Sequence, residues 1–135
     1  MTSTHDFVGY LPEGKPDQHT PASAAGGIEA AFRMLEGRWK LVILFHLFSG
    51  RLLRFSDLER AILYISQKML IQQLRQMEAD GIVTRLVHHQ VPPKVEYGLT
   101  DWGRSLCPAL DALLQWAEAK PPTVSAAADT ANGSD

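Results

Sequence analysis

The sequence has few of the residues that build disulfide frameworks, metal centres or membrane spans. Cys107 is its single cysteine, which excludes an internal disulfide and a CxxC metal or redox pair. The longest apolar stretch, Leu41 to Phe48, is interrupted by His46 and is far too short to cross a bilayer. The start also lacks a charged segment followed by an apolar one. We therefore expect no secretory signal, no membrane association and a cytoplasmic location.

Recognisable catalytic motifs are absent as well. The sequence has no G-x-S-x-G elbow, no P-loop and no H-E-x-x-H helix, so we expect neither an enzyme nor a bound cofactor. His88 and His89 could be metal ligands, but adjacent histidines usually diverge and no cysteine or third histidine is near, so we predict no metal site. Cys107 could be a thiol sensor, yet a lone cysteine near Leu106 and Leu110 is more typical of a small buried hydrophobe.

An excess of positive charge is also missing. The formal net charge is −2, but residues 28–118 hold 11 Lys and Arg against 10 Asp and Glu, so the acidity lies in the two ends. A segment this close to neutral does not attract nucleic acid through its overall field. Binding to DNA would have to come from a local patch of cations.

Composition divides the chain into three parts. Residues 1–27 hold three prolines and four glycines with little periodicity, which predicts a flexible N-terminal arm. Residues 120–135 are rich in small and polar residues and predict a disordered tail. The part between them, residues 28–119, is long enough for one domain with a modest core.

Helical signals dominate this domain. Residues 27–37 predict a first helix, and residues 38–50, apolar nearly all round, predict a second one at the centre of the core. A short helix over residues 54–62 is expected to be capped by the Ser56 hydroxyl. A last helix is expected over residues 101–119, capped by the preceding threonine. Gly103 and Pro108 should loosen or bend its first half.

The segment before the last helix changes character at a glycine. Leu70, Leu74 and Met77 form the buried stripe of a helix between Ser66, a plausible N-cap, and Gly81, a plausible stop. Two alternating runs follow and predict strands that enclose a protruding loop over residues 88–94. Helices followed by a β-hairpin predict a mainly α fold, a winged helix-turn-helix with four helices, a two-stranded wing and a C-terminal helix.

The exposed face of the fourth helix carries side chains that suit DNA. Gln67 and Gln72 match adenine, Arg75 matches guanine or phosphate, and Lys68 matches phosphate. Ile71, at the margin of this face, could lie against a thymine methyl. Taken alone, such a face is more often an ordinary solvated surface.

The adjoining hairpin shifts the balance towards DNA. Its tip combines His88, His89 and Lys94, and Arg85 lies on the first strand. A wing uses such residues on the minor groove or on its phosphates. We expect the positive groups of helix and wing to share one surface.

Several segments in a fixed order resemble a known family. They are LEGRWKLVIL (35–44), RFSDLERAI (54–62), ISQKMLIQQLRQMEADGIVTR (65–85) and VPPKVEYGLTDWGRSLCPALDAL (91–113). Together they resemble the HxlR family of winged helix-turn-helix transcriptional regulators, within the MarR-like group. The resemblance implies a homodimer on a palindromic operator in double-stranded DNA, and it adds Ser66 to the helix residues that contact DNA.

The resemblance also implies how the dimer forms. In this family the first and last helices make the interface, which here corresponds to Ile28, Phe32, Leu35, Leu110, Leu113, Leu114 and Trp116. A pocket for a small-molecule effector could form between helices at the dimer interface, lined by Phe32, Trp39 and Trp116. The two tryptophans are more typical of core or interface positions.

Two positions depart from the family. The resemblance implies that members that sense thiol stress use a cysteine before the first helix. This sequence has no cysteine there, so redox control of that type is not expected. The family often has a threonine where this sequence has Ile71. The exchange removes a hydroxyl donor and predicts a different base preference at that position.

These observations predict a dimeric, sequence-specific DNA-binding regulator. We expect a repressor of nearby genes that an unidentified small molecule or stress signal releases. The alternative is a winged-helix module that dimerises or binds a protein partner without specific DNA binding, and the near-neutral charge keeps it open. An enzyme is disfavoured because no nucleophile, base and orienting group occur together.

Overall fold

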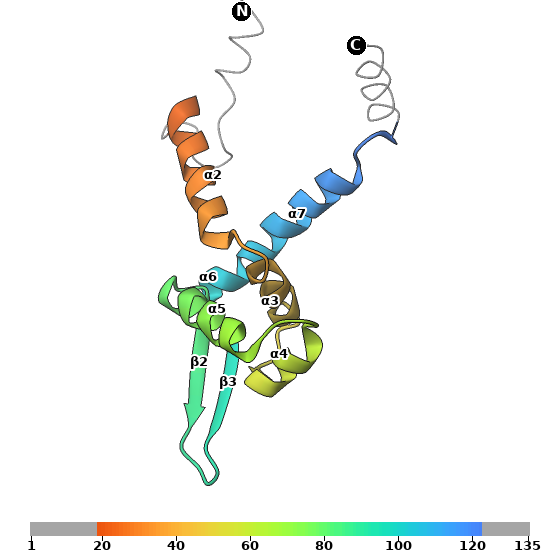
Figure 1. Cartoon of the computed structure of the whole chain (residues 1–135). Coiled ribbons are helices and arrows are strands. Elements are labelled where there is room, and N and C mark those ends of the chain that lie inside the picture. Colours follow the sequence, from red (N-terminus) through yellow and green to blue (C-terminus); the bar gives the residue numbers. More distant parts are fainter. Residues whose placement is uncertain (1–18, 123–135) are drawn as a thin grey trace, which may run out of the picture.

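The computed structural model describes residues 19–122, so most of the predicted arm and nearly all of the predicted tail lie outside the described residues. The elements follow one another as α2 (Pro21–Leu35), α3 (Lys40–Leu47), β1 (Leu53–Arg54), α4 (Phe55–Ala61), α5 (Gln67–Ala79), β2 (Val83–His88), β3 (Lys94–Leu99), α6 (Asp101–Arg104) and α7 (Leu106–Glu118). Helices α3 to α6 gather around one core. The hairpin β2–β3 extends from one side of it, and α2 and α7 extend and diverge on the other (Figure 1).

The predicted fold class is confirmed, with one addition to the sheet. The β2–β3 hairpin is the expected wing, but β1 pairs antiparallel with β3, so the sheet has three strands in the order β1-β3-β2. Strand β1 itself was not predicted. A strand of two residues is too short to show the alternation by which strands are found in a sequence.

The core lies where α3, α4 and α5 meet. Ile43 and Leu44 from α3, Leu58 from α4, and Leu70 and Leu74 from α5 are almost completely buried. The helix that the sequence placed at the core centre is less enclosed than its composition indicated. Its remaining apolar side chains include two that are exposed to solvent, those of Leu41 and Phe45.

The first helix begins earlier than predicted, so the boundary at residue 28 was wrong. Helix α2 starts at Pro21, and Thr20 and Ser23 form a capping box in which each hydroxyl accepts from the other residue's N–H. The two glycines of this segment suggested a flexible arm, whereas the cap and a proline in the first turn favour a helix start.

Helix α2 is anchored to the core at its C-terminal end, where Met34 also packs against the core cluster. Leu35 is its one buried residue. The ammonium group of Lys40, a buried side chain, donates to the carbonyl of Met34 at 3.3 Å. A cation beside the last turn of a helix also interacts favourably with the helix dipole. The rest of α2 extends away from the core (Figure 1).

The short helix α4 is not capped by Ser56, contrary to the prediction. It begins at Phe55, and the Asp57 carboxylate accepts from the backbone N–H of Arg54 at 2.9 Å. This hydrogen bond, together with the nearby Arg60 guanidinium, holds the pKa of Asp57 below its usual value. An aspartate in the first turn thus replaces the serine as the capping group.

The predicted last helix is divided in two. Helix α6 ends at Arg104, and α7 begins at Leu106. Pro108 has no N–H to donate to the carbonyl of Arg104, four residues earlier, and its ring would clash there. The break therefore follows from the position of the proline.

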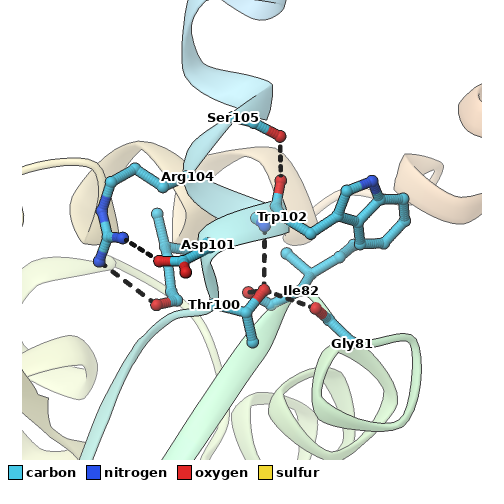
Figure 2. A network of polar contacts seen from close by, with 9 residues as sticks. Gly81, Ile82, Thr100, Asp101, Trp102, Arg104 and Ser105 are labelled. Atoms are coloured by element: carbon cyan, nitrogen blue, oxygen red, sulfur yellow. Dashed lines mark hydrogen bonds and ion pairs between the residues drawn. The ribbon is translucent and has the colours of Figure 1, made fainter.

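Thr100 joins α6 to the end of α5. Its hydroxyl donates to the carbonyls of Gly81, at 2.6 Å, and Ile82, at 3.2 Å, and accepts from the N–H of Gly103 at 2.9 Å (Figure 2). Its own N–H donates to the Ile82 carbonyl. Gly103 is required here because a Cβ at this position would collide with the Ile82 carbonyl oxygen.

Replacing Gly103 by alanine should therefore destabilise the protein. We expect Gly103→Ala to lower the free energy of unfolding by about 2–3 kcal/mol, because the new methyl group overpacks against backbone atoms. Chemical denaturation measures this effect. The matched control is Gly26→Ala in α2, where the added methyl group would have no neighbouring atom within 4 Å. It should stabilise the chain by about 0.5–1 kcal/mol; equal effects of the two variants would contradict the close approach.

Candidate nucleic-acid interface

Helix α5 has the limits and the two faces that its sequence predicts. The Ser66 hydroxyl accepts from the N–H of Met69 at 3.0 Å and caps the helix start. Gly81, with a φ of +82°, allows the chain to turn at the other end. Leu70, Leu74 and Met77 face the core. The opposite face is thereby held outward.

The exposed face of α5 gathers the side chains that the sequence selected for DNA. The residues that line a shallow hollow of about 510 Å³ on this face are Gln67, Lys68, Ile71, Gln72 and Arg75. Ile71 is 37% exposed, so its side chain is available beside the polar groups. Within residues 19–122, Lys68 and Arg75 form no ion pair, so their charges are free to meet an external anion.

A second groove lies between α5 and the wing. It has a volume of about 550 Å³ and is lined by Phe55, Gln67, Ile71, Arg75, Glu78, Arg85, Val95 and Tyr97. Arg85 thus faces the same space as Arg75, as expected. The sequence reasoning missed Phe55, Glu78, Val95 and Tyr97, although strand alternation places Tyr97 and Val95 on one face.

The wing separates its predicted DNA contacts between its two faces. Arg85 pairs with Tyr97 across the hairpin, and His88 pairs with Lys94 three residues further on. Because side chains alternate along a strand, His88 and Lys94 lie on the face opposite to Arg85. The expectation that all these cations share one surface with α5 was wrong.

Glu96 occupies the same face as His88 and Lys94. Its carboxylate lies 2.7 Å from Nε2 of His88 and 3.7 Å from Nζ of Lys94. The acid offsets part of the positive charge that the sequence assigned to the wing. Its position depends on the cross-strand register, which pairs it with Leu86. His89 stays exposed in the loop beyond β2.

The expected dimer residues fall into two groups. Leu35 and Leu110 are buried in the protomer's own core, each with 9% of its surface exposed. The large apolar side chains that remain exposed on α2 and α7 are Ile28, Phe32, Leu113, Leu114 and Trp116. These side chains belong to the two helices that diverge from the core in Figure 1.

The three residues expected to line an effector pocket at the dimer interface differ in exposure within the protomer. Phe32 and Trp116 are exposed, and Trp39 packs against the core beneath the Arg38 guanidinium, 4.4 Å from its ring centroid. A separate cavity of about 320 Å³ lies between α2 and the start of the C-terminal helices. It is lined by Gly27, Ala30, Ala31, Met34, Leu35, Ile82, Trp102, Gly103, Ser105, Leu106 and Ala109.

The described part of the chain holds neither a grouping of metal ligands nor a membrane-spanning helix. Within residues 19–122, no three His, Cys, Asp or Glu side chains are grouped so that they could hold a metal ion. None of the helices there is long and apolar enough to span a bilayer. Cys107 is half-buried and unpaired.

Comparisons with known proteins agree with this geometry. The profile of the HxlR-like helix-turn-helix family matches residues 34–124. An uncharacterized HTH-type transcriptional regulator of Bacillus subtilis, YtcD, is 53% identical over 89 residues, which cover 66% of this chain and 70% of that protein.

Solved structures with the same architecture are also known. The redox regulator HypR in its reduced form aligns with a TM-score of 0.66 at 40% identity, covering 74% of this chain and 98% of that one. A transcriptional regulator described as MarR-family, from Enterococcus faecalis V583, aligns with a TM-score of 0.68 at 34% identity, covering 86% and 96%.

Fold, site and relatives together define a winged helix-turn-helix transcriptional regulator. The chain belongs to the HxlR-like helix-turn-helix family. Relatives are named as HTH-type transcriptional regulators and not as enzymes, which confirms the prediction that this protein is no enzyme.

The contribution of the Ser66 cap can be tested by measuring the stability of the protein. Ser66→Ala removes the acceptor of the Met69 N–H and should lower the free energy of unfolding by about 1 kcal/mol. The control is Ser56→Ala, an exposed serine in α4 whose hydroxyl makes no hydrogen bond within the described residues. It should change stability by less than about 0.5 kcal/mol. A loss with Ser56→Ala as large as that with Ser66→Ala would contradict the assigned caps.

Proposed function

We propose that this protein is a homodimeric, sequence-specific DNA-binding regulator that represses nearby genes in the cytoplasm. The observation that carries the proposal is the exposed face of α5, where Lys68 and Arg75 remain unpaired beside Gln67 and Gln72. Two amides and two free cations, held outward by a buried opposite face, suit base edges and phosphates in a major groove. Ser66, at the start of the helix, would contact a phosphate.

The groove between α5 and the wing suits one DNA strand. A helix in the major groove and a wing at the adjacent minor groove have the intervening phosphate backbone between them. Arg75 and Arg85 line this groove and would bind that backbone from both sides. His88, His89 and Lys94 would contact DNA from the outer face and tip of the wing.

Dimerisation is supported by the apolar surface of α2 and α7. Phe32 is 55% exposed, and Trp116 is 75% exposed. Such side chains on two diverging helices form a patch of the kind that protein interfaces cover. In a dimer, the two α5 helices would reach half-sites whose centres lie about 34 Å apart on the DNA.

Release by a small molecule or a stress signal remains part of the proposal. The cavity between α2 and the C-terminal helices has the size of a small-molecule site and mostly apolar walls. Ile82 and Gly103, which line it, also take part in the joint at the end of α5. A molecule bound there would contact that joint directly.

A second candidate function is a winged-helix module that binds a partner other than DNA. The Glu96 carboxylate favours it, because its contacts with His88 and Lys94 place a negative charge among the cations of the wing. A gel shift with the DNA upstream of the protein's own gene, in moderate salt, separates the two functions. Retardation of that DNA, and not of a scrambled fragment, supports the regulator.

Arg75 offers a direct test of the DNA-binding face. Arg75→Ala should weaken operator binding by about 1–3 kcal/mol if Arg75 contacts a guanine, with relaxed preference at one base position. If it contacts phosphate, all sequences should bind less tightly and the salt slope should fall by about one. Arg33→Ala, an equal change of charge on α2, should leave both measurements unchanged. Unaltered binding by Arg75→Ala would remove this residue from the interface.

The proposed dimer can be tested by the mass in solution. Trp116→Glu places a charge in an apolar interface and should shift the protein towards a monomer in analytical ultracentrifugation. Val91→Glu makes the same kind of change at the wing loop, where the side chain is 99% exposed, and should leave the mass unchanged. A dimer that survives Trp116→Glu at low micromolar concentration would place the interface elsewhere.

A further inference from the structure

The turn that joins α4 to α5 contains an unusual residue. Tyr64 has a φ of +72° and is the only non-glycine residue with a positive φ among residues 19–122. This left-handed conformation brings Cβ close to the following carbonyl oxygen, so a bulky side chain is disfavoured there. The backbone at Tyr64 is therefore strained in the folded protein.

Nothing within the described part of the protomer offsets this strain through the tyrosine side chain. Ile62 and Ile65 are buried and anchor the turn at both sides, whereas Leu63 and Tyr64 between them are 71% and 88% exposed. The Tyr64 hydroxyl makes no hydrogen bond to any residue between 19 and 122. An aromatic ring this exposed gains little from packing. Strained residues of this kind concentrate at sites that bind a partner.

The location of Tyr64 identifies the partner. It lies two residues before Ser66, the cap of the helix that carries the DNA-contacting face. In a helix-turn-helix, the N-terminal residues of the second helix reach the bases while the first helix crosses the backbone, so the turn between them lies at the rim of the major groove. The groups at that rim are phosphates, which accept hydrogen bonds from tyrosine hydroxyls.

We propose that Tyr64 binds the DNA backbone, with its hydroxyl donating to a phosphate oxygen at the rim of the major groove. This inference rests on the proposed DNA-binding function and adds a contact outside α5 and the wing. Leu63 and Tyr64 alone are too small a surface for a protein partner, which needs roughly 800 Å² on each side. A phosphate contact holds the helix in register and reads no base.

Two substitutions at this position separate the hydroxyl from the backbone strain. Tyr64→Phe removes only the hydroxyl and should weaken binding on the order of tenfold, as measured by fluorescence anisotropy with an operator fragment. The loss should be similar for the operator and for random DNA, because the contact is to phosphate. The salt slope should stay unchanged, because a hydroxyl carries no charge.

Tyr64→Asn is the second variant, since asparagine adopts the left-handed region with less strain. It should raise the thermal unfolding midpoint above that of the wild type while binding DNA at least as weakly as Tyr64→Phe. Wild-type affinity in Tyr64→Phe, or a loss for the operator alone, would overturn the phosphate contact. If the wild-type protein itself does not bind DNA, the proposed function fails, and the Tyr64 contact fails with it. That result differs from a wild-type protein that binds DNA and a Tyr64→Phe variant that binds equally well, which would overturn the contact alone.

Discussion

Two carbonyl groups, those of Gly81 and Ile82, accept hydrogen bonds from one residue, Thr100, and the arrangement of the whole domain depends on this joint. It lies where α5 ends, β2 begins and α6 begins. The same threonine caps α6 through the N–H of Gly103, and the missing side chain of Gly103 lets the helix approach the Ile82 backbone. The direction of α5 is thereby coupled to the wing and to the C-terminal helices. A buried apolar core alone would leave these directions less defined, because apolar packing is not directional.

Much of α5 and its surroundings could be predicted because local signals agree there. The Leu70 and Leu74 stripe, the Ser66 cap and the Gly81 turn all indicate the same helix, and the structure has it within a residue or two. The misplaced boundaries arose where signals conflicted. The two glycines before Ile28 suggested a flexible arm although a capping box precedes them, so the start of α2 was predicted too late. In the last helix, the distortion expected near Pro108 is a break between α6 and α7, and α7 continues beyond the proline.

The candidate site could be predicted only in part, for a reason that concerns pairing between strands. The faces of α5 follow from its own periodicity, but the surroundings of His88 depend on which residues stand opposite across the hairpin. Strand parity alone would have placed Arg85 and His88 on different faces. The proximity of Glu96 needed the register of β2 against β3, which no local pattern supplies. Tyr64 looked ordinary because a backbone angle cannot be read from composition.

Helix α2 is attached to the core at one end only, so a small rotation at that end moves its other end much further. Its ties to the core, Leu35 and the Lys40 ammonium on the Met34 carbonyl, lie at the C-terminal end of a helix of 15 residues. At a rise of 1.5 Å per residue, the helix is about 22 Å long. A rotation of roughly 10° about these ties would move the far end by about 4 Å, given that length. In the proposed dimer, a displacement of less than about 1 Å in the atoms beside Lys40 would thus move the two subunits relative to each other by several ångströms. That distance is comparable with the rise of one base pair.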